Sequence, residues 1–309
     1  MTKVFIDGSA GTTGLRIYDR LTGRKDIELI ILSDEFRKDP AKRKEALNEA
    51  DIAFLCLPDD AAIEAVELAE GADTVIIDTS TAHRTSEQFI YGFPEIVGNS
   101  MIQNSKRIAN PGCHASGFVA LIYPLVKAGL ISGDEKLTCF SLTGYSGGGK
   151  KMIADYESAD RSELLKGPRQ YGLTQQHKHL KEMKRVCGLT YNPLFSPIVA
   201  DFYSGMEVSV PIFADSVKGS IENIKEVYKE FYQGPMVHFD EEADEAGFLS
   251  AATFSMRDDM QICVHGNDER IILTSRFDNL GKGASGSAIQ NMNIVLGLDE
   301  TTGLVTGGK

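Results

Sequence analysis

Short apolar segments alternate with longer helical stretches over the first 80 residues, and this alternation constrains the fold more than any other feature of the sequence. The apolar segments are four to six residues long and too continuous to alternate between polar and apolar positions. Such segments are typical of a parallel sheet that helices cover on both faces. The pattern therefore predicts a doubly wound, Rossmann-like α/β fold. The expected strands are residues 4–7, 28–32, 52–57 and 75–78, and the expected helices include residues 15–21 and 60–69.

The pattern changes after residue 111. Longer segments rich in β-branched residues follow, and helical stretches become fewer. This change predicts a second, α+β domain with a mostly antiparallel sheet. The expected strands are residues 137–143, 206–213, 248–255, 261–265 and 270–275, with helices at residues 221–231 and 286–296.

The composition is that of an ordinary globular enzyme, with 42% hydrophobic and 25% charged residues. The longest apolar stretch, residues 118–126, is about half the length that a membrane-spanning helix needs, and no leader precedes the first expected strand. The five cysteines are odd in number and scattered, which favours a reducing cytoplasm. We therefore expect neither a membrane nor a secreted protein.

The net charge of −12 argues against binding to nucleic acid or to an anionic membrane. It also means that any phosphate ligand needs local cations. Arg or Lys side chains beside glycine-rich turns are the candidates.

A glycine-rich turn follows the first expected strand and opens the first expected helix. Its spacing is Gly-x-x-Gly-x-x-Gly, not the commoner Gly-x-Gly-x-x-Gly. Glycines permit a tight turn and a close approach of a pyrophosphate to the backbone, and the helix N-terminus offers N–H groups. The alternative is an ordinary strand-to-helix turn without a ligand. The candidate coenzyme-binding residues here are Gly8, Ser9, Gly11, Thr12, Thr13 and Gly14.

The loop after the second expected strand bears on the choice between NAD and NADP. Asp34 could bind the ribose hydroxyls of NAD, whereas Arg37 and Lys38 could accept the additional phosphate of NADP. A solvated charged loop is the third possibility. The residues alone leave these alternatives open.

Cys113 is the most informative residue in the chain. It follows the turn-forming residues Pro111 and Gly112 and precedes an apolar helical segment, so we expect it at or just before a helix N-terminus. That position stabilises a thiolate, the reactive form of cysteine, and its N–H groups could receive the oxyanion of a tetrahedral adduct. The alternative is a small buried side chain. That role is expected for Cys56, Cys139, Cys187 and Cys263.

Two further polar clusters could hold an anion. Ser80 and Arg84 follow the fourth expected strand, at the sheet edge where such folds bind ligands. Lys150 and Lys151 follow a glycine-rich loop that could form an anion nest. Ordinary capped loops are the alternative for both clusters.

His177 and His179 are the candidate bases. Being two residues apart, they would point to different sides of a helix, so we expect only one to face a given site. No well-spaced set of partners supports a zinc site. The other histidines, expected on the surface or in the core, are His83, His114, His238 and His265.

These segments occur together in the order found in a known family. The chain resembles N-acetyl-gamma-glutamyl-phosphate reductases of the shorter, type 2 form over nearly its whole length. This resemblance implies membership of a wider group of enzymes that also includes aspartate-semialdehyde and glyceraldehyde-3-phosphate dehydrogenases. The resemblance is carried by the turn at residues 8–14, Asp78-Thr79-Ser80, Tyr91-Gly92-Phe93-Pro94-Glu95, Asn110-Pro111-Gly112-Cys113, residues 147–151, His177-Lys178-His179 and Asn279-Leu280-Gly281-Lys282-Gly283-Ala284.

The resemblance implies an NADP-dependent oxidoreductase of arginine biosynthesis. It would reduce N-acetyl-L-glutamyl 5-phosphate to N-acetyl-L-glutamate 5-semialdehyde and release phosphate. Cys113 would be the nucleophile and carry a thioester, with His177 favoured over His179 as the base. The candidate contacts to the substrate phosphate and carboxylate are Ser80, Arg84, Lys150 and Lys151.

The resemblance also resolves the choice of coenzyme in favour of NADP. Ser33, Arg37 and Lys38 are then expected to line the site of the 2′-phosphate. Asp34 is expected to turn outward, because a carboxylate in that site would repel the phosphate.

The expected domain organisation has three parts. Residues 1–112 form an NADP-binding domain, residues 113–284 a catalytic, substrate-binding and dimerisation domain, and residues 285–309 a C-terminal helix that returns to the first domain. The resemblance implies a cytoplasmic homodimer or homotetramer.

The chain departs from the longer members of the family at two places. They carry Ser-Ala-Asp-Phe-Arg where this chain has residues 80–84, and they differ after the cysteine at residues 114–116. The departures bear on the substrate contacts. The alternative functions are an acyl-phosphate reductase of the aspartate-semialdehyde dehydrogenase type and, in a different class, a non-enzymatic NADP-sensing regulator.

Overall fold

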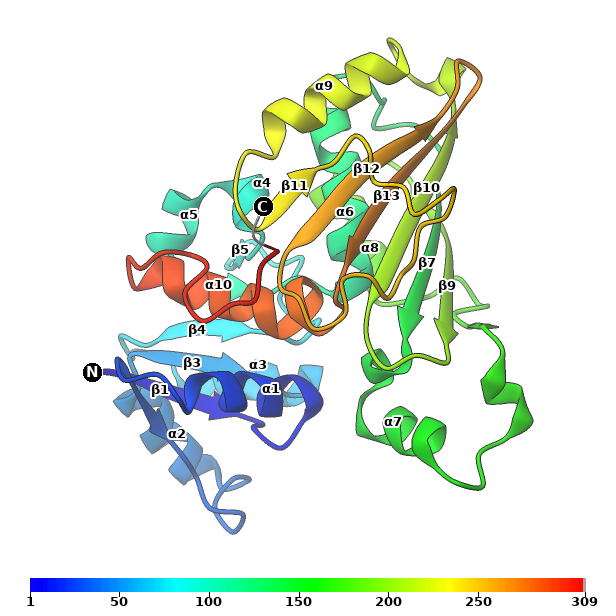
Figure 1. Cartoon of the computed structure of the whole chain (residues 1–309). Helices are drawn as coiled ribbons and strands as arrows, with labels where there is room; N and C mark the ends of the chain where they lie inside the picture. The colour runs from blue at the N-terminus through cyan, green and yellow to red at the C-terminus, as the bar shows by residue number, and fades with distance from the viewer. Residues whose placement is uncertain (308–309) are drawn as a thin grey trace. The chain divides into compact units, whose positions relative to one another are not determined.

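The computed structural model describes residues 1–307, and the chain divides into two compact units (Figure 1). Unit 1 comprises Met1–Pro111 and Ala284–Leu304. Unit 2 comprises Gly112–Gly283 together with residues 305–307. Residues 308 and 309, the last two of the expected C-terminal segment, lie outside the described residues.

Unit 1 is built on a six-stranded sheet in the order β2-β1-β3-β4-β6-β5, and every pair of neighbouring strands is parallel. This confirms the predicted doubly wound α/β class. The strands are β1 (Thr2–Asp7), β2 (Ile27–Ile30), β3 (Ile52–Leu55), β4 (Val75–Asp78), β5 (Ile90–Tyr91) and β6 (Arg107–Ala109). The helices are α1 (Thr12–Leu21), α2 (Pro40–Glu49), α3 (Asp59–Leu68), α4 (Pro94–Val97), α5 (Asn99–Gln103) and α10 (Gly286–Val295).

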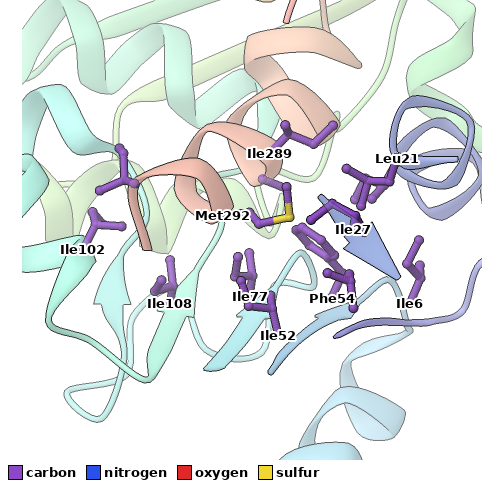
Figure 2. Close-up of a cluster of buried hydrophobic side chains, with 14 residues drawn as sticks. Ile6, Leu21, Ile27, Ile52, Phe54, Ile77, Ile102, Ile108, Ile289 and Met292 are labelled. Atoms are coloured by element: carbon purple, nitrogen blue, oxygen red, sulfur yellow. The ribbon is translucent and has the colours of Figure 1, made fainter. Parts of the chain in front are cut away.

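Helix α10 completes the core of unit 1, although 172 residues of unit 2 separate it from the other elements in sequence. Figure 2 shows Ile289 and Met292 of this helix directed toward Phe54, Ile77 and other side chains of the sheet. All four are almost fully buried. Burial of each such side chain is worth about 1.5–3 kcal/mol, so α10 is a structural part of unit 1.

A buried ion pair joins α2 to β1. The Arg43 guanidinium lies 2.9 Å from the carboxylate of Asp7, and both side chains are at most 6% exposed. Arg43 also contacts Glu64 of α3 at 2.6 Å. Helix α2 itself begins with Pro40 after Asp39, whose carboxylate accepts hydrogen bonds from the N–H groups of Ala41 and Lys42.

Unit 2 is built on a seven-stranded sheet in the order β11-β12-β13-β10-β7-β9-β8. Four of its six strand pairs are antiparallel, and the pairs β11·β12 and β7·β9 are parallel. This confirms the predicted mostly antiparallel sheet. The strands are β7 (Thr138–Gly144), β8 (Arg169–Gln170), β9 (Leu194–Ala200), β10 (Met206–Phe213), β11 (Val237–Phe239), β12 (Met260–Gly266) and β13 (Arg270–Phe277). The helices are α6 (Cys113–Lys127), α7 (Gly149–Glu157), α8 (His179–Val186) and α9 (Ile221–Phe231).

Helices cover one face of this sheet, with α6 against β10 and β13 and α9 against β12 (Figure 1). Strand β10 shows the result in its alternation of buried and more exposed residues. Val208 and Val210 are buried, whereas Phe213 on the opposite face is 66% exposed. Phe140 and Ile272 are also exposed large apolar residues. Unit 2 thus has a sheet face without helices on which large apolar side chains are exposed among polar ones.

The expected strand at residues 248–255 is wrong. These residues form turns, held by hydrogen bonds from Ser250 N–H and the Thr253 hydroxyl to Glu245. Phe254 is buried under the guanidinium groups of Arg257 and Arg276, 4.2 and 5.7 Å from its ring centroid. Tertiary contacts therefore override the apolar pattern. No sequence pattern predicted β8, β9 or β11.

Within residues 1–307, no helix combines the length and the apolar character needed to cross a membrane.

Candidate active site

Cys113 is the first residue of α6, as the turn before it predicts. Gly112 has extended backbone angles at the N-cap, and no side chain caps the helix there. The Gly112 N–H donates to the buried carboxylate of Glu182 at 2.9 Å, which fixes the turn. The N–H groups at the start of α6 and the positive end of its dipole therefore lie next to the Cys113 sulfur, where they stabilise negative charge.

Cys113 opens into a cavity of about 520 Å³ within unit 2. The cavity also receives Tyr171, His177 and His179, and the glycines at residues 147 and 148 contribute backbone to its wall. It thus unites the predicted nucleophile with both predicted bases.

The expectation that only one of the two histidines faces the site is wrong. His177 precedes α8, which begins at His179, so the helical spacing does not apply to the pair. The two rings lie edge to face with their centroids 4.8 Å apart, and both line the cavity.

A third histidine, His114, is buried, which agrees with the core role expected for it, and it also lines this cavity. Its ring centroid lies 5.6 Å from that of His177 and 5.5 Å from that of His179. In the sequence, His114 directly follows the predicted nucleophile, but this adjacency does not show which polar groups its ring meets.

Burial in the cavity disfavours the charged forms of His114 and His177. Burial, with a smaller contribution from the neighbouring His177, lowers the pKa of His114 to about 3. Burial and the charge of Lys178 also lower the pKa of His177. A neutral imidazole can accept a proton, so His177 is suited to act as a base near neutral pH.

Gly283 lies against the nucleophile from the far end of unit 2. A Cβ added to this glycine would lie 2.9 Å from the Cβ of Cys113, closer than Cβ contacts in proteins normally are. No sequence pattern identified this contact, because the two residues are 170 positions apart.

The other cysteines lie in settings that disfavour a thiolate. Cys139, Cys187 and Cys263 are buried, and burial raises the pKa of each. Burial also raises the pKa of Cys56 to about 12.

The glycine-rich turn of unit 1 borders a separate cavity of about 250 Å³. Gly8 has φ +88°, and a Cβ there would collide with the carbonyl of Cys56, so only glycine fits. A Cβ at Gly14 would lie 2.5 Å from the Gly8 carbonyl oxygen. Gly11 caps α1 without a side-chain hydrogen bond, so the N–H groups of the first turn of α1 are available to a ligand. Gly11, Thr12, Thr13 and Gly14 are not among the residues that line the cavity. Ser9 lines the cavity.

The cations predicted to bind a 2′-phosphate lie at this cavity. Arg37 and Lys38 both line it, together with the ends of β1 and β2. The side chain of Asp34 is 94% exposed, and it lies 3.6 Å from Arg37. Ser33 is exposed, and its carbonyl accepts hydrogen bonds from the Phe36 and Arg37 N–H groups. Backbone N–H groups and two cations at this cavity could hold the phosphates of a dinucleotide.

The predicted substrate contacts lie in both units. In unit 1, Ser80 donates to the buried carboxylate of Asp78, and Arg84 donates to the carbonyls of Thr79 and Asn110. In unit 2, Lys150 and Lys151 are exposed at the start of α7 and are not among the residues that line the cavity of Cys113. Among residues 1–307, no group of three or more His, Cys, Asp and Glu side chains is arranged to hold a metal ion.

Two family models match the chain. Residues 34–104 match the model described as semialdehyde dehydrogenase, NAD binding domain, which identifies unit 1 as an NAD(P)-binding unit. Residues 113–279 match the model described as semialdehyde dehydrogenase, dimerisation domain.

Curated relatives match over nearly the whole length. N-acetyl-gamma-glutamyl-phosphate reductase 2 of Nostoc sp. is 43% identical over 98% of this chain and 99% of its own. The N-acetyl-gamma-glutamyl-phosphate reductase of Chelativorans sp. is 44% identical over 95% and 98% of the two chains. N-acetyl-gamma-glutamyl-phosphate reductase 2 of Pseudomonas putida is 40% identical over 95% and 96%.

Solved structures with a similar fold include the aspartate semialdehyde dehydrogenase of Francisella tularensis. It has a TM-score of 0.71 at 15% identity and covers 96% of this chain and all of its own. Aspartate semialdehyde dehydrogenase II of Vibrio cholerae gives a TM-score of 0.70, also at 15% identity, and covers 96% and 98%. At such low identity the similarity concerns the fold alone.

Proposed function

This chain belongs to the N-acetyl-gamma-glutamyl-phosphate reductase family, and we propose that it reduces N-acetyl-L-glutamyl 5-phosphate to N-acetyl-L-glutamate 5-semialdehyde in arginine biosynthesis. Phosphate is released, and NADPH is the reductant. The observation that carries the mechanism is Cys113 at the N-terminus of α6, in one cavity with His177 and His179.

The first half of the reaction is acyl transfer to Cys113. The thiolate attacks the acyl carbon, phosphate leaves with the bonding electron pair, and a thioester remains. The N–H groups at the start of α6 stabilise both the thiolate and the oxyanion that forms on the acyl oxygen. The wall of the cavity positions the acyl group against the sulfur.

The second half converts the thioester into the aldehyde. The coenzyme, when bound, supplies the hydride for this reduction. One of His177 and His179, having taken the proton of the Cys113 thiol, can give it to the oxygen of the resulting adduct and take it back when the aldehyde leaves. We favour His177 as the base, because burial and Lys178 hold its imidazole neutral.

NADP is the coenzyme that best fits unit 1. Its pyrophosphate suits the turn with Gly8, Gly11 and Gly14, and its 2′-phosphate suits Arg37 and Lys38. The side chain of Asp34 is 94% exposed but lies 3.6 Å from Arg37, so the 2′-phosphate would take its place as the partner of Arg37.

The substrate carries a phosphate and a carboxylate and therefore needs cations. Arg84, Lys150 and Lys151 are the candidates, with Ser80 as an additional donor. Lys150 and Lys151 are the more accessible, because Arg84 already donates to two carbonyls and Ser80 to Asp78.

We propose a homo-oligomer, a dimer or a tetramer, formed through the sheet face of unit 2 that no helix covers. Phe140, Phe213 and Ile272 are between 46% and 66% exposed on that face, and a second copy of the sheet would bury them. We place the enzyme in the cytoplasm, where a reactive thiol stays reduced.

The test is the reverse reaction with purified protein. N-acetylglutamate semialdehyde, NADP and inorganic phosphate together should give NADPH, and omission of phosphate should abolish it. Faster reaction with aspartate semialdehyde would instead assign the shorter substrate. Tight NADP binding without any turnover that depends on a thiol would favour a regulator.

A further inference from the structure

His114 lies in the middle of a row of three polar side chains. Its Nδ1 lies 2.6 Å from Oγ of Ser141 on β7, and its Nε2 lies 2.7 Å from the hydroxyl of Tyr171. His114 is 3% exposed and Ser141 is fully buried, whereas Tyr171 reaches the cavity. The row therefore runs from the core of unit 2 to the cavity that contains Cys113.

Three protons are available to this row. The ring of His114 is neutral, because burial lowers its pKa to about 3, and so it has a single N–H. Burial raises the pKa of Tyr171, and the charge of Cys113 raises it further, so the phenol keeps its proton. Ser141 supplies the third proton. Two hydrogen bonds use two of these protons, and the third must point out of one end of the row.

The surroundings of Ser141 determine which end that is. If Nδ1 carried the ring proton, Ser141 would accept it and would need another acceptor for its own O–H. Within residues 1–307, His114 is the sole hydrogen-bond partner of the Ser141 hydroxyl. A fully buried hydroxyl proton without an acceptor is strongly unfavourable. Ser141 therefore donates to Nδ1, and the Nε2–H of His114 donates to Tyr171.

We propose that His114, held in this tautomer by Ser141, is a positioning residue that directs the Tyr171 proton into the cavity as a hydrogen-bond donor. Its acceptor is the acyl oxygen of the group bound to Cys113, an assignment that rests on the proposed function. A donor fixed in advance stabilises the negative charge that develops on this oxygen. His114 itself touches no reacting atom and acts through Tyr171.

Two substitutions of His114 test the proposal, because the amide of each replaces a different ring nitrogen. In His114→Asn the amide takes the place of Nδ1 and does not reach Tyr171, so kcat should fall by roughly tenfold to a hundredfold. In His114→Gln the amide N–H replaces Nε2–H, and kcat should stay within about fivefold of the wild type. The KM for NADP should stay unchanged in both. The matched control is His238→Asn on β11, a histidine outside the cavity, which should retain activity.

Coupling to Tyr171 distinguishes positioning from a general structural effect. Tyr171→Phe should lose about as much kcat as His114→Asn, and the double variant should lose no more than the larger single loss, within about twofold. The rate of carboxymethylation of Cys113 should remain within about twofold of the wild-type rate in both single variants and in the double variant. Losses that multiply in the double variant, or a His114→Asn enzyme with full kcat, would overturn the proposal. A large fall in the rate of carboxymethylation would assign His114 to the thiol instead.

A measurement without turnover separates this proposal from the proposed function. In ¹⁵N-histidine-labelled protein, protonated and unprotonated ring nitrogens resonate far apart, and the His114→Asn spectrum identifies the signals of His114. A protonated Nε2 and a bare Nδ1 are expected, with loss of this preference in Ser141→Ala. A protonated Nδ1 in the wild type would overturn the tautomer argument, whatever substrate the enzyme uses. Inactivity toward the acetylated semialdehyde, with a protonated Nε2, would contradict the proposed substrate and leave the positioning of Tyr171 intact.

Discussion

Gly283 and Cys113 are in such close contact that a Cβ on the glycine would lie 2.9 Å from the Cβ of the cysteine. Gly283→Ala must therefore displace the nucleophile or the turn at the start of α6. A misplacement of about 1 Å can cost on the order of a hundredfold in rate, so we expect a loss of at least about tenfold in kcat at unchanged NADP affinity. Steady-state kinetics and a fluorescence titration with NADP measure the two quantities.

Gly167→Ala is the matched control for that substitution. This glycine also lies in unit 2, has an ordinary negative φ, and has no atom within 4 Å of its added Cβ. Its activity should equal that of the wild type. Equal activity of Gly283→Ala and Gly167→Ala would show that the contact with Cys113 does not constrain catalysis.

Cys113→Ser should abolish turnover, because an alcohol at this position is not ionised near neutral pH and attacks the acyl carbon poorly. NADP affinity should stay within a few-fold, since the coenzyme cavity belongs to unit 1. Mass spectrometry of the wild type mixed with acyl phosphate should find the acyl group on Cys113. A serine variant with full activity would refute the thioester mechanism.

Lys178→Met should move the pKa of His177 upward, toward its ordinary value of 6.5. Burial and, secondly, the charge of Lys178 lower this pKa, and the substitution removes only the second cause. The neutral form of a base is lost as the pH falls through its pKa, so the acid limb of the pH–rate profile should shift to higher pH. An NMR titration of His177 measures the pKa directly. Lys181→Met, an exposed lysine of α8, is the control and should leave both curves in place.

Arg37→Ala should raise the KM for NADPH strongly and the KM for NADH hardly at all. A charge-assisted contact to the 2′-phosphate is worth about 1.5–3 kcal/mol, which corresponds to roughly tenfold or more in selectivity. Lys44→Ala removes an exposed cation of α2 that does not line the cavity, and it should leave both constants unchanged. An equal effect of Arg37→Ala on both coenzymes, or a wild type that prefers NADH, would contradict this assignment.

Arg43→Ala should destabilise unit 1 by about 3–5 kcal/mol, because it leaves the buried carboxylate of Asp7 without its partner. The loss of stability can be measured by urea denaturation, with hydrogen exchange of the β1 amides as the readout for unit 1. Lys42→Ala removes an exposed pair with Glu45 on the same helix and should leave stability near that of the wild type. If both variants unfolded at the same urea concentration, the buried pair would contribute nothing to unit 1.

The strands of unit 1 were predictable because their burial on both faces leaves a local signature. The apolar segments at residues 52–57 and 75–78 begin where β3 and β4 begin. The two-residue β5 is too short for any such signature. The strand predicted at residues 248–255 was wrong because its apolar residues serve another purpose. Phe254 packs beneath two arginines and not beside another strand.

The candidate site was predictable where its chemistry follows from neighbours in sequence. Cys113 could be placed at a helix start because Pro111 and Gly112 precede it. His114 could not be assigned, because the polar atoms that define its role belong to Ser141 and Tyr171, 27 and 57 residues away. The resemblance to the reductase family is confirmed, but it carried no information on this residue.

The position of α10 in the sequence imposes an order on synthesis. The ribosome makes β1 to β6 first, then all 172 residues from 112 to 283, and only afterwards the helix that covers Ile77 and Phe54. The nascent sheet therefore presents an apolar surface throughout the translation of unit 2. Such a surface favours aggregation of incomplete chains, so nascent molecules stalled before residue 286 should depend on chaperones more than finished ones do.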